Sequence, residues 1–303
     1  MRIVLAGGTG FIGRALKQKL LSAGHEVVVL TRKSSAGAKA RESFVAWDGR
    51  NTGEWAASLD GADAVINLSG ENIAAKRWTP EQKQKILASR VDATRAIVNA
   101  IGLARQKPAL LINASAVGYY GDAGNRELTE ARARGAGFLA ETCESWETEA
   151  RKAERLGVRV ILARLGPVLG EKGGMLSKML PPFRFFLGAP LGTGKQWISW
   201  VHQEDVTGAL LFMLEQGDLS GPVNVTSGVP ATMKDFCRTL AKILSRPSWP
   251  PVPSIFLKML MGEMATIILA SQKVLPLRLL EAGYHFRYPD LSAAFAAILK
   301  ENA

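Results

Sequence analysis

Three glycines near the start of the chain constrain its fold more than any other feature. The apolar segment Arg2–Ala6 runs directly into Gly7-Gly8-Thr9-Gly10-Phe11-Ile12-Gly13, and a segment of helical periodicity follows. In such a strand–turn–helix unit, Gly7 allows a sharp turn, Gly10 lets a pyrophosphate approach the backbone, and Gly13 permits close packing of helix on strand. The N–H groups and dipole of the helix N-terminus favour an anion. The segment therefore predicts dinucleotide binding by Gly7, Thr9, Gly10, Phe11, Ile12 and Gly13.

The end of the second expected strand indicates which dinucleotide is bound. An NAD site usually carries Asp or Glu there to accept a hydrogen bond from the ribose 2′-hydroxyl, whereas a 2′-phosphate calls for cations. This chain has Thr31-Arg32-Lys33. An arginine can stack on adenine and pair with the phosphate at once. We therefore expect NADP, held by Thr31, Arg32 and Lys33; the alternative is that Arg32 and Lys33 are ordinary exposed cations.

Short apolar runs alternate with longer periodic segments through the first two thirds of the chain, which is typical of strands and helices around a parallel sheet. Strands are expected at Arg2–Ala6, Glu26–Leu30, Phe44–Trp47, Ala64–Asn67, Ala109–Ala114, Val158–Leu165 and Val223–Thr226. Helices are expected at Phe11–Ala23, Pro80–Ile101, Phe138–Leu156 and Asp205–Glu215, Thr232–Ser245 is amphipathic, and Ile255–Ala303 is expected to be mostly helical. Asp205 is expected to cap the helix that begins with Val206.

These elements predict an α/β fold: a Rossmann-type doubly wound parallel sheet with a smaller, mainly helical C-terminal domain on the substrate side. After about Gly166 glycine and proline become frequent and the alternation is lost. We assign residues 1–170 to the NADP-binding domain, with 205–228 returning to it. Residues 171–204 and 229–303 are assigned to the smaller domain.

The charge balance bears on the kind of partner. The chain carries 38 Lys and Arg against 27 Asp and Glu, a formal net charge of +11, which favours an anionic partner unless it serves solubility alone. The basic residues are spread over many segments without a nucleic-acid motif, so no nucleic-acid partner is expected. The apolar stretch Ile255–Ala270 is interrupted by Lys258 and Glu263 and falls short of the roughly 20 apolar residues of a membrane span. No membrane partner is expected.

Two cysteines, Cys143 and Cys237, are too few for a disulfide framework and form no metal-binding cluster in the sequence. A reducing compartment fits them. No secretory signal precedes the first strand, which follows the initiator Met directly. We expect a cytoplasmic protein without a metal site.

Several segments resemble the extended short-chain dehydrogenase/reductases. Besides the glycine turn, they are Val65–Gly70, Ala114–Gly121, Arg164–Gly170 and Trp200–Val206. Gly70–Ile73, Arg77-Trp78, Trp146-Glu147, Ser271–Val274, Pro276 and Leu279–Tyr284 are similar to the atypical epimerase-like subfamily. Members of that subfamily carry a short C-terminal domain of unknown function and are often labelled nucleoside-diphosphate-sugar epimerases. Relatives in cyanobacteria and plastids have also been labelled cell-division inhibitors.

The resemblance implies further cofactor contacts. Leu68, Ser69 and Gly70 would run beside the adenosine ribose and pyrophosphate, and Gly166 and Val168 would present backbone to the nicotinamide. Many extended members have an Asn early in the helix after the fourth strand, where this chain has Arg90. Arg90 either points inward to the cofactor or is a cation on the helix surface.

The usual catalytic pair of the superfamily, Tyr-x-x-x-Lys, is missing. Four residues after the four tyrosines stand Ala123, Gly124, Tyr288 and Ser292, so no tyrosine has a lysine one helical turn away. Ser115 matches the substrate-orienting serine of the family, with a strand-end hydroxyl bonded to backbone as the alternative. Tyr120 is the nearest acid/base candidate, with structural packing as the alternative.

Two functions remain open from the sequence. The first is an NADP-dependent oxidoreductase or epimerase that acts by hydride transfer on an unknown small molecule. The excess of bases between Arg159 and Gln203 favours an anionic one. The second is a non-catalytic NADP(H)-binding sensor or scaffold, linked to cell division if the labels of some relatives apply. The sequence gives neither the substrate nor the oligomeric state.

Overall fold

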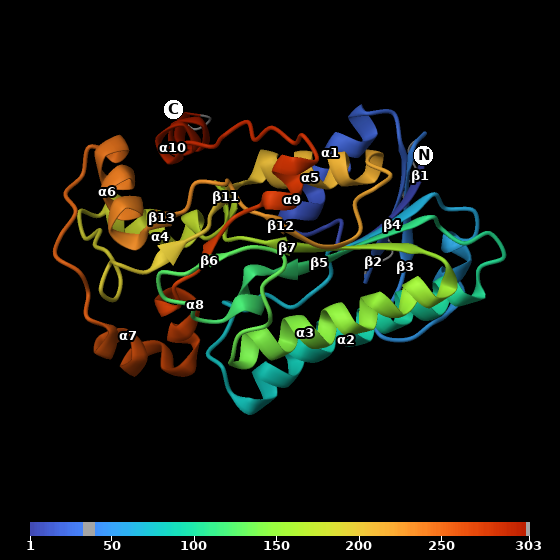
Figure 1. Cartoon of the computed structure of the whole chain (residues 1–303), viewed down its shortest axis with the longest axis horizontal. Helices are drawn as coiled ribbons and strands as arrows, with labels where there is room; N and C mark the ends of the chain where they lie inside the picture. The colour runs from blue at the N-terminus through green and yellow to red at the C-terminus, as the bar shows by residue number, and fades with distance from the viewer. Residues whose placement is uncertain (33–39, 301–303) are drawn as a thin grey trace.

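The computed structural model describes residues 1–32 and 40–300. Within this part of the chain, a seven-stranded parallel sheet has the strand order β12-β7-β5-β4-β1-β2-β3 (Figure 1). Its strands are β1 (Arg2–Ala6), β2 (Glu26–Thr31), β3 (Glu42–Ala46), β4 (Ala64–Asn67), β5 (Leu110–Ala116), β7 (Arg159–Leu165) and β12 (Gly221–Val225). The strand order reverses between β1 and β4, and open α/β sheets bind ligands at the carboxyl ends of such strands.

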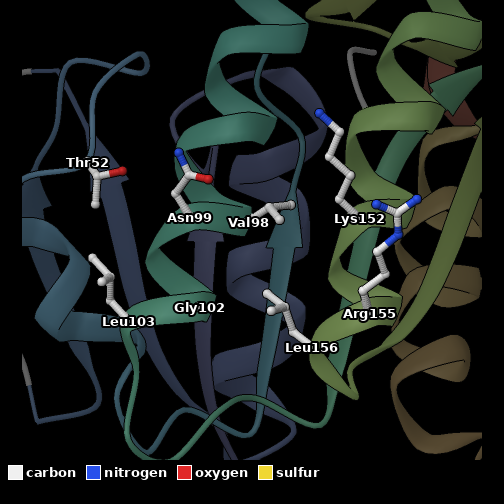
Figure 2. Close-up of a pocket in the computed structure, with 8 residues that line it drawn as sticks. All are labelled: Thr52, Val98, Asn99, Gly102, Leu103, Lys152, Arg155 and Leu156. Carbon is white, nitrogen blue, oxygen red and sulfur yellow. The ribbon is translucent and has the colours of Figure 1, made fainter.

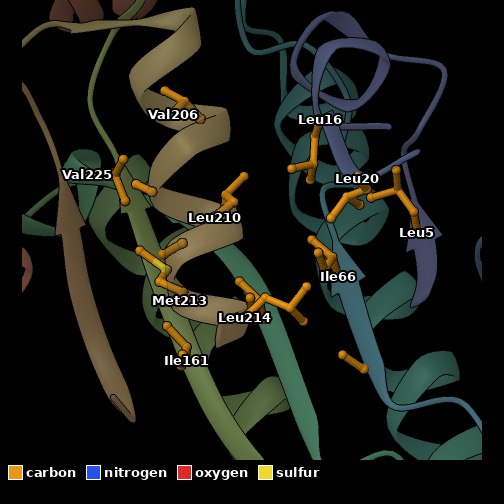
Figure 3. Packing of buried hydrophobic residues seen from close by; sticks show 14 of the residues in the cluster. Leu5, Leu16, Leu20, Ile66, Ile161, Val206, Leu210, Met213, Leu214 and Val225 are labelled. Atoms are coloured by element: carbon orange, nitrogen blue, oxygen red, sulfur yellow. The ribbon is translucent and has the colours of Figure 1, made fainter. Parts of the chain in front are cut away.

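Helices cover both faces of this sheet (Figure 1). α1 (Phe11–Ser22) and α5 (Gln203–Glu215) lie on one face, and α2 (Pro80–Leu103) and α3 (Phe138–Arg151) lie on the other. Figure 3 shows Leu16 and Leu20 of α1 and Leu210 of α5 packed toward the sheet beside Leu5 and Ile66. Burial on both faces explains why the strands are continuous apolar runs.

The C-terminal lobe is built around a separate apolar cluster that includes Phe183, Trp200, Phe236 and Phe295. Its helices are α4 (Leu176–Arg184), α6 (Met233–Leu244), α7 (Ser254–Met261), α8 (Thr266–Leu269) and α10 (Leu291–Lys300), whereas α9 (Leu277–Glu281) buries Leu279 in the core of the main sheet. Short strands join it to the main sheet: β8 (Val168–Gly170), β9 (Gly173–Gly174) and β11 (Val201–His202); β10 (Trp197–Ile198) with β13 (Ala231–Thr232); and β6 (Glu127–Leu128) with β14 (Lys273–Val274). The 3-10 helices are η1 (Glu54–Leu59), η2 (Val117–Tyr120), η3 (Lys152–Leu156) and η4 (Gly262–Ala265).

The doubly wound parallel sheet and the helical C-terminal region predicted from the sequence are confirmed. The expected helix Phe138–Leu156 is α-helical only to Arg151 and continues as the 3-10 helix η3. Of the helices in the described part of the chain, none combines the length and apolarity that crossing a bilayer requires.

The expected role of Asp205 as a helix cap is wrong. α5 begins at Gln203, and the cap is His202, whose Nδ1 accepts a hydrogen bond from the backbone N–H of Glu204 at 3.1 Å. Asp205 instead accepts hydrogen bonds from the backbone N–H groups of Arg287 and Tyr288 at 2.6 and 3.0 Å. Its carboxylate thereby ties the C-terminal segment to α5.

Candidate functional site

The glycine turn between β1 and α1 leaves no room for a side chain at Gly7 or at Gly13. A Cβ on Gly7, whose φ is +78°, would lie 2.7 Å from the carbonyl carbon of Leu68, and a Cβ on Gly13 would lie 2.1 Å from the Gly7 oxygen. The Gly7 oxygen also accepts a hydrogen bond from the Gly10 N–H at 3.0 Å. The turn is thus held tightly against the loop that follows β4.

The N-terminus of α1 begins at this turn and is suited to an anion. Gly10 is its N-cap, no side chain in the described residues caps it, and its first turn contains no carboxylate. The first N–H groups of a helix have no partner within the helix. A Cβ on Gly10 would meet only the Gly7 oxygen, at 3.2 Å. The backbone at Gly10 and Phe11 can therefore be approached closely by a phosphate, which the helix dipole favours.

A buried polar cluster orients the loop beside the turn. The Asn67 amide donates to Asn113 Oδ1 at 2.7 Å and to Thr94 Oγ1 at 2.9 Å. Its oxygen accepts from both the backbone N–H and the hydroxyl of Ser69. Trp146 Nε1 also donates to Thr94 Oγ1, at 2.9 Å. These contacts fix the position of Ser69, although the sequence reasoning did not single out Asn67, Thr94 or Asn113; polar residues inside otherwise apolar strands were the available signal.

Arg90 reaches from α2 to the same loop. Its guanidinium carbon would lie 3.1 Å from a Cβ on Gly70, and it lies 5.1 Å from the centre of the Trp146 ring. Nη1 donates to the Ile86 carbonyl at 2.9 Å. Burial lowers the pKa of Arg90, and no carboxylate in residues 1–32 and 40–300 forms an ion pair with it. The structure thus places a partly buried cation next to the loop residue Gly70, where the charge of Glu71 acts on it without a close ion pair.

The loop after β7 is held as tightly as the glycine turn. The Gly166 N–H donates to the Val225 carbonyl at 3.0 Å, and a Cβ on Gly166 would lie 2.0 Å from the Ser199 oxygen. Val168 follows in β8, where it pairs with Val201 of β11. Only a glycine fits at position 166. Its backbone directly follows the carboxyl end of β7, which pairs with the carboxyl end of β5.

Arg32 lies at the same edge of the sheet as the glycine turn. β2 pairs with β1 so that Leu30 is opposite Ala6, Thr31 ends the strand, and Arg32 follows it on the surface. Lys33, the third predicted contact of the 2′-phosphate, lies outside the described residues. The position of Arg32 suits recognition of an anion on the adenosine side of a bound dinucleotide.

Ser115 and Tyr120 belong to one hydrogen-bonded chain. Ser115 Oγ donates to Glu147 Oε1 at 2.7 Å, and Glu147 receives two hydrogen bonds from Arg164, both at 2.8 Å. Arg164 Nη1 donates to the Tyr120 hydroxyl at 2.9 Å, and that hydroxyl donates to Asn224 Oδ1 at 2.8 Å. The structure therefore brings both predicted catalytic hydroxyls together through a bidentate ion pair.

This ion pair is deeply buried. The side chains of Arg164 and Glu147 are 3% and 4% exposed, and the Arg164 guanidinium carbon lies 3.5 Å from the centre of the Tyr119 ring. Burial alone would lower the pKa of Arg164, but the hydrogen bonds and charge of Glu147 outweigh it, and the pKa rises. Burial raises the pKa of Tyr120 despite the adjacent Arg164. At neutral pH Tyr120 is therefore a phenol that lies beside a permanent cation.

Two surface hollows lie on the described part of the chain. One, of about 620 Å³, is lined by residues near the C-terminus of α2 and along η3 (Figure 2). Because α2 runs antiparallel to the strands, its C-terminus lies at their amino edge, away from the glycine turn. The other, of about 570 Å³, is lined by residues of α1 and α5 and by the turn between β8 and β9, and it contains both basic and acidic side chains: Arg14, Lys19, Lys172, Glu171 and Glu204. Within the described residues, no group of three or more His, Cys, Asp or Glu could hold a metal ion.

Comparisons with known proteins agree with this geometry. Residues 3–226 match the NAD dependent epimerase/dehydratase family, and residues 252–298 match a domain of unknown function, DUF1731. The epimerase family protein SDR39U1 homolog of Arabidopsis thaliana chloroplasts is 41% identical over 99% of this chain and 87% of its own length. The epimerase family protein YfhF of Bacillus subtilis is 39% identical over 100% of this chain and 99% of its own length.

Solved structures give the same result. The crystal structure of human epimerase family protein SDR39U1 with NADPH has a TM-score of 0.90 and 36% identity, with each chain covered completely. A nucleoside-diphosphate sugar epimerase from Corynebacterium glutamicum has a TM-score of 0.79 and 34% identity over 99% of this chain and 58% of that one. This chain therefore belongs to the NAD-dependent epimerase/dehydratase family.

Proposed function

We propose that the chain binds NADP(H) at the carboxyl edge of the sheet and transfers hydride to or from a small anionic molecule. The choice of NADP(H) rests on the residue that follows β2. Arg32 stands there in place of the acid of an NAD site, at the same edge of the sheet as the glycine turn. The NADPH in the human SDR39U1 structure supports the same choice. Among the bases between Arg159 and Gln203, Lys172 lines a hollow together with Phe11, the first residue of α1, which supports an anionic substrate.

Each group of residues has a distinct part in this proposal. The backbone from Gly7 through Thr9 to Gly13 holds the pyrophosphate, including the N–H groups of Phe11 and Ile12. The 2′-phosphate is held by Thr31, Arg32 and Lys33. The loop Leu68–Gly70 runs along the ribose, with Arg90 behind it as a compensating cation.

At the other end of the cofactor, the backbone of Gly166 and Val168 contacts the nicotinamide. Bound NADP(H) supplies the hydride chemistry, and the protein supplies placement and electrostatics. Ser115 and Tyr120 are the proposed proton-handling groups: Arg164 places a cation 2.9 Å from the Tyr120 hydroxyl, which opposes but does not outweigh the rise in the pKa of Tyr120 that burial causes.

Arg32→Ala is expected to remove the preference for NADP(H). Loss of a charged hydrogen-bond donor to the 2′-phosphate should weaken NADPH binding about 10- to 100-fold. NADH lacks that phosphate, so its affinity should change less than about twofold by the same reasoning. Titration of the wild-type and variant chains with both nucleotides measures this. Equal affinities of the wild-type chain for NADPH and NADH would contradict the assignment of NADP.

Tyr120→Phe and Ser115→Ala are expected to reduce turnover at saturating NADPH. Loss of a general acid should cost about 100-fold or more in kcat, and loss of an orienting hydroxyl about tenfold. The assay is oxidation of NADPH in a screen of phosphorylated, carboxylated and nucleotide-linked carbonyl compounds. Unchanged NADPH affinity serves as the control for folding. Turnover that survives both substitutions would show that other groups handle the proton.

A second function is favoured by one observation: both hydroxyls are buried, at 2% and 3% exposure, and both are already hydrogen-bonded within the chain. A protein that binds NADP(H) without turnover, as a sensor or scaffold, would have this arrangement. The same substrate screen separates the two. NADPH binding with no oxidation by any carbonyl class supports the sensor or scaffold.

A further inference from the structure

The helix α7 presents an apolar side that the described chain leaves uncovered. Ile255, Phe256, Met259 and Leu260 are 66%, 57%, 69% and 77% exposed, and only Leu257 of this helix is buried. Residues at positions i, i+1, i+4 and i+5 lie along one side of a helix. α7 therefore carries a stripe of large apolar side chains that faces outward.

Further large apolar side chains are exposed on the connector before α7 and on the segment after α4. Phe185, Phe186, Leu187 and Trp249 are 76%, 53%, 72% and 55% exposed. Trp249 Nε1 donates to the Phe186 carbonyl at 2.6 Å, which joins the connector before α7 to the segment after α4. In the same connector, Val252 pairs with Leu191. α7 begins two residues later, at Ser254. We call these eight residues the apolar surface.

This surface lies in two segments whose charged residues are all basic, and acidic residues flank both of them: Glu171 and Glu204, and Asp235 and Glu263. Segments 172–203 and 236–262, which contain all eight of its residues, include no Asp or Glu. Their cations are Lys172, Lys178, Arg184, Lys195, Arg238, Lys242, Arg246 and Lys258. None of these cations forms an ion pair within residues 1–32 and 40–300. Much of the net charge of +11 is therefore gathered in the lobe that carries the apolar surface.

Cations stand directly among the apolar side chains. The Arg246 guanidinium carbon lies 4.3 Å from the centre of the Phe186 ring, Arg184 precedes Phe185, and Lys258 lies on α7. Figure 1 shows α7 and α6 at the end of the molecule remote from the N-terminus of β1. Neither of the two hollows described above is lined by a residue of the apolar surface. The surface thus combines protruding aromatic and aliphatic groups with cations, and does so away from those hollows.

This combination fits one partner best. Two copies of the chain that met through this surface would oppose cation to cation, which disfavours self-association. Exposed Phe and Leu side chains on α7 beside Lys258, with Trp249 and Arg246 on the connector before it, are the residue types found in segments that lie in the plane of a bilayer. Such a helix inserts its apolar side only about 5–10 Å, so it needs no spanning length.

We propose that the apolar surface binds the face of a membrane rich in anionic phospholipid, with α7 lying in the plane of the interface. The apolar side chains enter the boundary between headgroups and acyl chains, and Arg184, Arg246 and Lys258 contact lipid phosphates. This revises the sequence-based expectation of no membrane partner, which considered a spanning segment. It is independent of the substrate and goes beyond the proposed hydride transfer.

The test is co-sedimentation of the full chain with vesicles of phosphatidylcholine alone and of phosphatidylcholine with about 30% phosphatidylglycerol. We expect at least tenfold stronger partition onto the anionic vesicles, because a cation near such a surface contributes about fivefold in affinity. Binding should fall as salt rises from about 0.1 M to about 0.5 M, since screening shortens the reach of these charges.

The double variant Phe256→Gln with Leu260→Gln should lose at least about tenfold in partition, because two exposed apolar side chains no longer enter the bilayer. The matched control is Leu103→Gln. Leu103 is 71% exposed near the C-terminus of α2, about 30 Å along that helix from Lys83, which contacts Glu263 of η4. This control should bind anionic vesicles as the wild type does. NADPH affinity, measured in parallel, should be the same in all three chains.

Several results would overturn the proposal. The first is equal partition of the wild type onto neutral and anionic vesicles. The second is a loss of partition in Leu103→Gln as large as in the double variant, and the third is unchanged partition of the double variant. Sedimentation velocity that shows a dimer dissociated by the double variant would instead assign the surface to a second copy. If polyglutamate displaces both the wild type and the double variant from anionic vesicles, the binding rests on attraction between charges alone. None of these outcomes depends on whether NADPH binds, so failure here is distinct from failure of the proposed function.

Discussion

Glu147→Gln is expected to lower the free energy of unfolding by about 3–5 kcal/mol. Glu147 accepts two hydrogen bonds from Arg164 and one from Ser115, and the two charged side chains are almost fully buried. A neutral amide leaves the Arg164 charge buried without a counter-charge, and only one of its two terminal atoms can accept. Denaturant unfolding at neutral pH measures the loss.

The matched control for this prediction is Glu144→Gln on the same helix. Glu144 is 51% exposed and pairs at 2.7 Å with Arg134, which is 33% exposed. Solvent screens such a pair, and its loss should cost less than about 1 kcal/mol. If the two variants unfold at the same denaturant concentration, Glu147 does not stabilise the fold through its buried charge.

Gly10→Ala is expected to weaken NADPH binding by about 100-fold or more while leaving the fold intact. The new methyl group would lie 3.2 Å from the Gly7 oxygen, a contact that a small shift relieves. It would occupy the approach of the pyrophosphate to the backbone. Loss of two charged hydrogen bonds, at about 1.5–3 kcal/mol each, gives that factor. Fluorescence titration with NADPH measures affinity, and thermal unfolding without nucleotide measures stability.

Two further glycines separate binding from folding. Gly217 has no neighbour within 4 Å of its Cβ position, so Gly217→Ala should change neither property. A methyl group on Gly13 would lie 2.1 Å from the Gly7 oxygen, so Gly13→Ala should lower stability as well as affinity. Full NADPH affinity in Gly10→Ala would show that the pyrophosphate does not contact this turn.

Local signals were sufficient to predict the elements that carry the cofactor edge. β1 and β4 begin and end where the apolar runs do, and α1 starts at Phe11, directly after Gly10. Strands buried on both faces are short continuous apolar runs, which flanking glycines delimit. For these elements, neighbours in sequence hold most of the information.

The buried network could not be predicted in the same way. Ser115, Glu147 and Arg164 lie on β5, α3 and β7, so their contacts depend on how a helix packs across two strands. The sequence identified Ser115 and Tyr120 from a resemblance, but the ion pair between them joins side chains 17 residues apart with no periodic signal. Arg90 is a similar case, because its position against Gly70 follows from the path of the loop after β4.

The C-terminal lobe was predicted only as mainly helical. Its joints to the sheet are strands of two residues, such as β14 on β6, whose partners lie about 146 residues apart. No pattern of that length distinguishes a strand from a loop. The outward apolar side of α7 was likewise hidden, since an apolar run in a sequence is ordinarily read as buried.

A crystal structure of the chain with NADPH tests the central claim most directly. We predict that the pyrophosphate lies against the backbone N–H groups at the start of α1, near Gly10. The 2′-phosphate should contact Arg32, and the nicotinamide should lie against Gly166 and Val168. A nucleotide bound away from the glycine turn, or a 2′-phosphate that faces solvent without Arg32, would contradict the account.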